Sequence, residues 1–248
     1  CFFQGTPEEQ ARLTNIYQGK AKVPLFIAMD AEWGLGMRFA KTTQSFPKQL
    51  TLGAIEDNNL IYDMGLEVAK QLKSIGVNVN FAPVVDINNN PNNPVINYRS
   101  FGEDLYNVGA KSYAYARGMQ EGGLIACAKH FPGHGDTDVD SHYDLPILNI
   151  SRERIDSLEL APFKMLSELG IKSVMSAHLH VPAIDNRPNR PTTLSSKAIN
   201  GILRNEIGFD GLVFTDAMDM QGVAKHFAPG VAELEALMAG NDILLLPR

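Results

Sequence analysis

The sequence predicts an α/β fold built on a parallel sheet, and a (β/α)8 barrel of the TIM type fits it best. Short apolar runs alternate with helix-like stretches along the chain, as expected for parallel strands that are buried on both faces. A doubly wound sheet is the alternative. It would use a glycine-rich phosphate turn, and residues 30–36, DAEWGLG, do not match that motif.

Seven segments are predicted as strands because they are short and nearly all apolar. They are CFF (1–3), VPLFIAMD (23–30), VNVNFAPVVD (77–86), GLIACAKHF (123–131), IKSVMSAH (171–178), GLVFTDAM (211–218) and DILLLP (242–247). A closed barrel of this type has eight strands. We therefore expect a single barrel domain over residues 1–248 with cropped ends, about seven of whose strands lie in this chain.

Helices are predicted between these strands, and residues 6–19 show the signals most clearly. Thr6 is suited to cap the helix, Pro7 lies in its first turn, and Gly19 closes it. Five further helices are predicted over residues 58–76, 107–123, 151–170, 195–208 and 230–240. This alternation of strand and helix is what favours a parallel α/β fold.

The composition excludes several classes of function. The net charge is −6 and the 22 Lys and Arg residues form no run, so a nucleic acid partner is not expected. Cys1 and Cys127 lie far apart and form no motif, which excludes a disulfide scaffold. No apolar run approaches the roughly 18–20 residues of a membrane span, so we expect no such segment.

Polar residues stand at the carboxyl ends of five predicted strands. They are Asp30, Asp86, Lys129 with His130, His178, and Asp216. Any single Asp among them can be explained as a turn or cap residue. The carboxyl ends of barrel strands converge on one face, however, and active sites lie on that face. The set as a whole therefore indicates an active site.

The segment KHFPGHGDTDVDSHYDLP, residues 129–146, leaves one of these strand ends as a polar loop. Its Gly and Pro residues favour a loop, and a loop over the mouth of a barrel can present a catalytic group. Asp140 and His142 lie two positions apart, so in an extended loop the carboxylate can hold the imidazole in one tautomer. This pair is predicted to act as a general acid and base.

Asp216, within FTDAMDM (214–220), is the predicted nucleophile, because a carboxylate fixed at a strand end is suited to attack a sugar anomeric carbon. Asp219 is its rival in this motif, and its place beyond the strand end favours capping or solvating the next helix. A metal site is the alternative for the loop, which contains several His and Asp residues. Its spacing matches no zincin or deaminase signature, so we expect neither a metal nor another cofactor.

These motifs resemble those of the family 3 glycoside hydrolases, and within that family the bacterial β-N-acetylhexosaminidase branch. The resemblance covers nearly the whole chain and rests on MDAEWG (29–34), NFAPVVDI (80–87), YRSFGED (98–104), the loop 129–146, MSAHLHVPAID (175–185), FTDAMDM and AGNDILLLP (239–247). The loop is the most specific of these, because the β-glucosidases of this family lack its D-S-H element and take their acid/base from elsewhere.

The resemblance implies a role for each candidate residue. Asp216 would form a covalent glycosyl-enzyme, and His142, paired with Asp140, would be the acid/base. The residues that would bind the sugar are Asp30, Arg38, Arg99, Lys129 and His130. In the family's D-x-E-G-G turn this chain has Trp33 in place of the first Gly, and we expect its ring to form a wall of the pocket.

The activity implied by the resemblance is removal of terminal β-linked N-acetylglucosamine by double displacement with retention. The substrates would be peptidoglycan fragments, as in peptidoglycan recycling, or chitooligosaccharides. Some members of this branch are phosphorylases, so water and phosphate both stay open as acceptors, and a β-glucosidase is a further alternative. A non-catalytic sugar-binding module would lack Asp216 or the D-S-H pair, and both are present. The resemblance points to the cytoplasm or periplasm of a bacterium and leaves the oligomeric state open.

Overall fold

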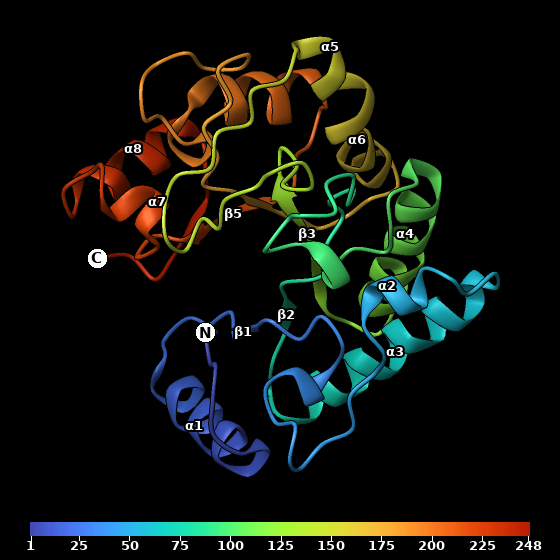
Figure 1. The fold of residues 1–248 in the computed structure, drawn as a ribbon. Coiled ribbons are helices and arrows are strands. Elements are labelled where there is room, and N and C mark those ends of the chain that lie inside the picture. The colour runs from blue at the N-terminus through green and yellow to red at the C-terminus, as the bar shows by residue number, and fades with distance from the viewer.

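The computed structural model describes residues 1–248 as a half-barrel of parallel strands with helices around its outer face (Figure 1). The six strands of the sheet follow chain order from β1 to β6, and every neighbouring pair is parallel. A doubly wound sheet would instead place later strands on both sides of the first. The predicted parallel α/β architecture is therefore confirmed, in the form of part of a barrel.

The strands are β1 (Ala28–Met29), β2 (Val79–Asn80), β3 (Ile125–Phe131), β4 (Ser173–Ser176), β5 (Leu212–Ala217) and β6 (Ile243–Leu245). Each lies inside one of the predicted segments, but the prediction of seven strands was wrong by one, because residues 1–3 form no strand. The Phe2 N–H donates to the Ala28 carbonyl at 3.4 Å, and one such bond does not make a ladder.

The helices are α1 (Pro7–Lys20), α2 (Gln49–Leu52), α3 (Asn58–Ser74), α4 (Leu105–Glu121), α5 (Arg152–Arg154), α6 (Ala161–Glu168), α7 (Gln221–Ala224) and α8 (Val231–Ala239). Wider π-type turns occupy Ile155–Glu159 and Lys197–Glu206, and short 3-10 turns occupy Leu35–Met37, Asn97–Arg99 and Thr192–Leu194. Thr6 caps α1 as predicted, by accepting the Glu9 N–H.

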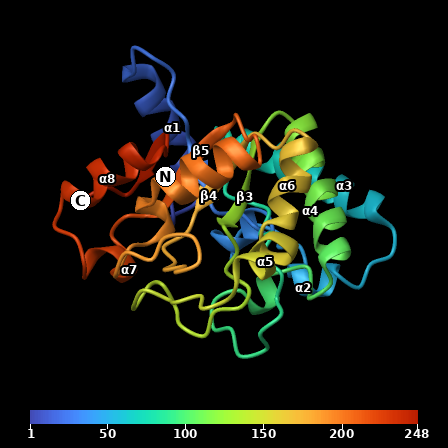
Figure 2. The same ribbon diagram turned by 90° about the horizontal axis from the view of Figure 1, so that it is seen from above.

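Helices α3, α4 and α6 stand together on one side of the sheet (Figure 1, Figure 2). None of the helices combines the length and apolar composition that crossing a bilayer requires.

The helix predicted over residues 151–170 is divided into pieces. The π-type turns 155–159 separate α5 from α6, and Pro162 lies in the first turn of α6. Pro162 has no N–H to donate to the carbonyl of Leu158, four residues earlier, so a regular α-helical ladder cannot run through this point. Proline is well tolerated in a first turn, which is why α6 begins here.

The hydrophobic core has three parts, the smallest of which includes Met218, Val223 and Ala232. The other two parts contain the residues of the sheet. The larger part includes Leu72, Phe131 and Phe163 and packs the sheet against the outer helices. The smaller part lies among the strands of the half-barrel and consists of Ala28, Val79, Phe81, Cys127, Met175 and Phe214. The rings of Phe81 and Phe214 meet edge to face with their centroids 5.3 Å apart. Met175 of this smaller cluster also lines the cavity described below.

Two strands are irregular close to their carboxyl ends. The register of β3 with β4 shifts around His130, and the register of β5 with β6 shifts just before Ala217. An irregularity of this kind interrupts the regular alternation of side chains and re-aims them. As a result, Lys129 and His130, which are neighbours in the sequence, face the same cavity.

Candidate active site

A cavity of about 310 Å³ opens at the carboxyl ends of the strands. Its wall is built from segments far apart in the sequence, from Phe3 before β1 to Leu245 in β6. The wall includes seven of the eight candidate residues of the sequence, namely Asp30, Arg38, Arg99, Lys129, His130, His142 and Asp216. The eighth, Asp140, lies behind His142. The polar strand ends of the half-barrel thus meet in one place.

Two carboxylates that follow β1 hold the Arg and Lys side chains of the cavity wall. Asp30 accepts from Arg38 Nη2 and from Lys129 Nζ, each at 2.8 Å. Glu32 is fully buried and accepts from Lys129 Nζ at 2.8 Å and from Arg99 Nη2 at 2.7 Å. Lys129 therefore bridges the two carboxylates, and each Arg or Lys in the wall has an anionic partner.

Burial and pairing pull the pKa values of this network in opposite directions. Burial alone would raise the pKa of Glu32, but Arg99 and Lys129 lower it to well below its ordinary value. Burial alone would lower the pKa of Lys129, but Asp30 and Glu32 raise it. Glu32 and Lys129 are consequently both charged at neutral pH. A polar ligand that enters the cavity therefore meets donors and acceptors that are already held in place.

His130 is oriented by a buried carboxylate behind it. Its Nδ1 lies 2.7 Å from Asp86 Oδ2, and the same carboxylate accepts the backbone N–H groups of His130 and His134. Burial would raise the pKa of Asp86, but His130 lowers it, so the carboxylate stays ionised. With Nδ1–H donated to Asp86, the other nitrogen, Nε2, faces Arg99 Nη2 at 3.4 Å.

Asp216 stands near the end of β5 with one carboxylate oxygen engaged. Its Oδ1 accepts the Ala217 N–H at 2.8 Å, which leaves Oδ2 for other chemistry. Burial would raise the pKa of Asp216, but the imidazoles of His130 and His178, the Ala217 N–H and Lys129 together lower it below its ordinary value. Asp216 is therefore ionised at neutral pH, which is what a carboxylate nucleophile requires.

His142 lies on the rim of the cavity, in the loop 132–146 that follows β3. Asp140 Oδ1 accepts the backbone N–H of His142 at 2.8 Å and lies 2.7 Å from its Nδ1. This contact leaves Nε2 as the nitrogen that can exchange a proton. The His142 side chain is 61% exposed, so it can meet the leaving group of a ligand that projects from the cavity.

Three further residues with polar side chains line the cavity although they were not among the predicted site residues, namely Glu32, His134 and Ser141. Burial lowers the pKa of His134 to about 4, so this side chain is neutral at pH 7. Its Nδ1 lies 2.6 Å from Thr137 Oγ1, and its Nε2 lies 3.4 Å from Ser141 Oγ. Glu32 lies in the turn that follows Asp30, and His134 and Ser141 lie in the loop that carries His142. This closeness in sequence to predicted site residues was the only signal that could have identified them.

Two other polar residues near the site do not line the cavity. His178 is buried, with Nε2 2.9 Å from the Ala217 carbonyl oxygen and Nδ1 2.8 Å from Thr193 Oγ1. It therefore supports the backbone next to Asp216 and does not face a ligand. Asp219 is exposed, and it does not cap α7, whose N-cap residue is Met220.

The expectation that Trp33 forms a wall of the pocket is wrong. Its ring packs against Tyr98, with centroids 6.5 Å apart, and Lys48 Nζ lies 3.0 Å above it. The physical reason is a tight turn at this point, closed by the Gly34 N–H donating to the Ala31 carbonyl at 3.1 Å, in which Glu32 lines the cavity and Trp33 does not. No group of three or more His, Cys, Asp or Glu side chains is arranged to hold a metal ion.

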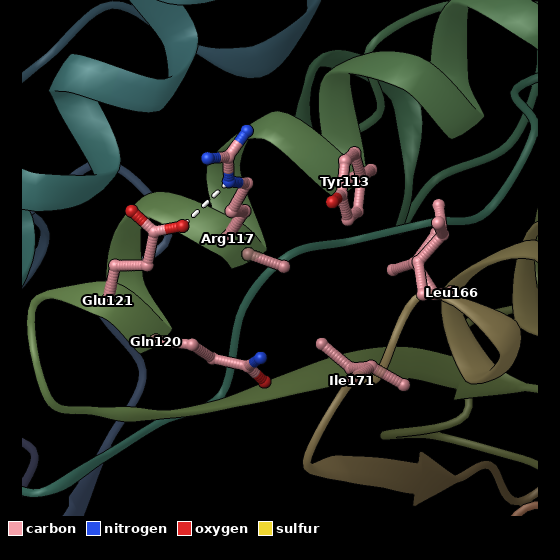
Figure 3. A pocket seen from close by; sticks show the side chains of 8 residues that line it. Tyr113, Arg117, Gln120, Glu121, Leu166 and Ile171 are labelled. Carbon is pink, nitrogen blue, oxygen red and sulfur yellow. Dashed lines mark hydrogen bonds and ion pairs between the residues drawn. The ribbon is translucent and has the colours of Figure 1, made fainter.

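A second hollow, of about 210 Å³, lies on the outer surface beside α4 and α6 (Figure 3). Figure 3 shows Arg117 turned toward Glu121, and Arg117 Nε donates to that carboxylate at 2.7 Å. Leu166 and Ile171 form much of the opposite side. The two charged groups are paired with each other, so this hollow lacks the convergent polar groups of the cavity at the strand ends.

Comparison with known proteins identifies the family. The model of the glycosyl hydrolase family 3 N-terminal domain matches residues 5–248. The chain belongs to this family. It is 39% identical over 244 residues to beta-hexosaminidase A of Pseudoalteromonas piscicida, an alignment that covers 93% of this chain and 41% of that protein. The family 3 chain thus spans less than half the length of this relative.

Solved structures of other proteins share the half-barrel. A family 3 beta-N-acetylglucosaminidase from Paenibacillus sp. str. FPU-7 matches with a TM-score of 0.93 and 40% identity, over 98% of this chain and 48% of that chain. NagZ from Neisseria gonorrhoeae, in complex with N-trifluoroacetyl-D-glucosamine, matches with a TM-score of 0.86 and 32% identity, over 98% and 70%. Beta-glucoside phosphorylase BglX matches with a TM-score of 0.94 and 27% identity, over 99% and 46%. The same fold therefore occurs in proteins named for two different reactions.

Proposed function

We propose that this family 3 chain carries the catalytic site of a retaining exo-β-N-acetylglucosaminidase. The observation that carries the proposal is a single cavity with a partly buried, ionised carboxylate in its wall, Asp216, and an imidazole on its rim, His142, oriented by Asp140. Retaining hydrolysis of glycosides needs a nucleophile and an acid/base placed in this way. The cavity wall runs from Phe3 to Leu245, which supports treating residues 1–248 as one catalytic domain.

The first step of the proposed reaction forms a glycosyl-enzyme. Asp216 Oδ2 attacks the anomeric carbon, the bond from that carbon to the leaving oxygen breaks, and His142 Nε2 gives its proton to that oxygen. The proton is needed because a sugar alkoxide is a poor leaving group. In the second step His142 takes a proton from water, the water oxygen attacks the anomeric carbon, and Asp216 is released. Two inversions retain the β configuration.

The sugar is held, in this proposal, by the residues of the ion-pair network and by one imidazole, namely Asp30, Arg38, Arg99, Lys129 and His130. Asp30, Glu32 and Asp86 hold these side chains at distances of 2.7–2.8 Å, so little side-chain freedom is lost when a sugar binds. We take the sugar to be terminal β-linked N-acetylglucosamine, in peptidoglycan fragments or chitooligosaccharides. Family membership and the names of the hexosaminidase relatives support that choice.

A phosphorylase is the second candidate. The likeness to BglX favours it, and an imidazole acid/base repels an incoming phosphate less than a second carboxylate would. The charges of the cavity favour water instead. Arg38, Arg99 and Lys129 each have a carboxylate partner at 2.7–2.8 Å, so no Arg or Lys of the wall is left over to bind a phosphate dianion.

The test is a comparison of rates on an aryl N-acetyl-β-glucosaminide and the matching aryl β-glucoside, each with and without phosphate. We expect faster turnover of the N-acetylglucosaminide, with no acceleration by phosphate and no sugar 1-phosphate among the products. Faster turnover of the glucoside would overturn the choice of sugar. Phosphate-dependent release of N-acetylglucosamine 1-phosphate would establish the phosphorylase reaction instead.

A further inference from the structure

The loop 132–146, which carries His142, is seated on α7. The Gly222 N–H donates to the Ser141 carbonyl at 3.1 Å. Ser141 is only 2% exposed, whereas the two residues that follow it, His142 and Tyr143, are exposed. The loop is therefore anchored to α7 at the residue immediately before His142.

At Gly222 the backbone of the helix lies close to the loop. A Cβ atom on Gly222 would lie 3.2 Å from the carbonyl oxygens of Ser141 and Asp144, and 3.4 Å from His178 Cβ. The backbone of Gly222 is not in the left-handed region, so its conformation does not require glycine. Glycine is also a poor helix former. The absence of a side chain at Gly222 instead allows the loop to contact α7 closely.

Two further contacts hold the same part of the loop. Lys225, just after α7, places Nζ 3.2 Å from Asp144 Oδ2. On the cavity side, His134 Nε2 lies 3.4 Å from Ser141 Oγ. The Lys225 and Asp144 side chains are 43% and 57% exposed, so solvent screens their attraction. The contacts of Ser141 with Gly222 and with His134 are buried and are not weakened in this way.

The part of α7 that contacts the loop is connected to Asp216 through a short stretch of backbone. The Ala217 N–H donates to the Asp216 carboxylate, and the Ala217 carbonyl accepts the Met220 N–H at 3.1 Å. Gly222 follows Met220 by two residues, within α7. A short, internally hydrogen-bonded stretch of backbone thus joins Asp216 to the surface on which the loop rests.

We propose that Gly222 is a positioning residue, which sets the distance between His142 and Asp216 by letting the loop rest directly on α7. The inference rests on the proposed function, because it takes His142 to be the acid/base. A side chain at position 222 pushes Ser141 and Asp144 outward, and His142 moves with them. The proton donor then no longer reaches the leaving oxygen, while Asp216 and the ion-pair network stay in place.

The test uses Gly222→Ala and Gly222→Val, with Gln221→Ala on the exposed side of α7 as the matched control. Each variant is assayed for hydrolysis of chitobiose and for the burst of dinitrophenolate from 2,4-dinitrophenyl N-acetyl-β-glucosaminide. Dinitrophenolate leaves without a proton, so the burst does not depend on His142. For Gly222→Val we expect chitobiose hydrolysis to fall roughly 10- to 100-fold and the burst rate to stay within about twofold. Gly222→Ala should show a smaller loss of the same kind, and the control none.

An equal loss on both substrates, or no loss in either variant, would overturn the inference. If Gly222→Val does not fold, Gly222→Ala and Lys225→Met provide the same comparison of substrates, and an equal or absent loss in both again overturns it. Failure of the proposed function is distinguished by Asp216→Asn. If that variant keeps turnover within about tenfold of the parent, the nucleophile is wrongly assigned, whatever the result at position 222.

Discussion

Replacing Glu32 with Gln removes one negative charge from the centre of the ion-pair network and keeps the shape of the side chain. The fully buried Glu32 carboxylate accepts from Arg99 at 2.7 and 3.1 Å and from Lys129 at 2.8 Å. Lys129 keeps Asp30 as a partner at 2.8 Å. Arg99 keeps no carboxylate and is only 18% exposed, so the substitution leaves one cation poorly compensated.

The size of the effect follows from this geometry. Two unit charges 2.8 Å apart attract by ~6 kcal/mol at an effective dielectric constant of ~20. The cost of burying the carboxylate offsets part of this, and removal of one partner from a buried pair costs about 3–5 kcal/mol. Because Lys129 stays paired, we expect the lower value, about 3 kcal/mol in the free energy of unfolding. For a chain of this length that loss corresponds to a fall in Tm of ~6–12 °C.

The pH dependence of stability provides a second measurement. Folding lowers the pKa of Glu32, so its stabilising contribution is fully present above its unfolded pKa of about 4.3. That contribution is lost as the pH falls toward the lower pKa of the folded state. Denaturant titrations of the parent and of Glu32→Gln should therefore differ by a constant amount between about pH 6 and 8, and by less below about pH 4.

Glu67→Gln is the matched control for this measurement. Glu67 pairs with Lys70 at 3.5 Å on the surface of α3, where the two side chains are 46% and 80% exposed, so the change should affect stability little. A loss below about 1 kcal/mol in Glu32→Gln would refute the reasoning. A loss that stays undiminished at low pH would refute it equally, because the protonated Glu32 of the parent then resembles Gln.

The proposed chemistry leads to two further predictions. Asp216→Asn should lower hydrolysis by several orders of magnitude, because the covalent route disappears, and steady-state rates within about tenfold of the parent would contradict the assignment. His142→Ala should cripple chitobiose hydrolysis but spare the dinitrophenolate burst, and added azide should restore turnover and give the β-glycosyl azide. Equal losses on both substrates without azide rescue would exclude His142 as the acid/base.

The site residues at the strand ends were predictable because the pattern that marks them lies within a few residues of the sequence. An apolar run that ends in a charged residue, such as the one before Asp30 or the one that contains Asp216, is visible without knowledge of the strand's neighbours. Which of these side chains point into the cavity was not predictable in this way. Lys129 and His130 would face opposite sides of a regular strand. Both line the cavity because the register of β3 with β4 shifts between Lys129 and Phe131.

The roles of the buried carboxylates were hidden for a related reason. Glu32 is separated from Arg99 by 67 residues, and Asp86 from His130 by 44. A sequence shows the acid but not the distant partner that it holds. It therefore cannot show which carboxylate orients another side chain, and only the folded chain shows that Glu32 holds Arg99 and that Asp86 holds His130.

The difference in burial between Asp216 and His142 has a consequence for how this site can change over evolutionary time. Asp216 is held within the sheet, whereas His142 stands on an exposed loop that touches α7 at a small buried contact. Insertions and deletions are tolerated far better in such a loop than in a barrel strand. If His142 is the proton donor, as proposed, the donor is an exchangeable part of the site. A lineage can then lengthen, replace or discard the loop and recruit a donor from elsewhere in a longer chain, while inheriting the floor of the cavity unchanged.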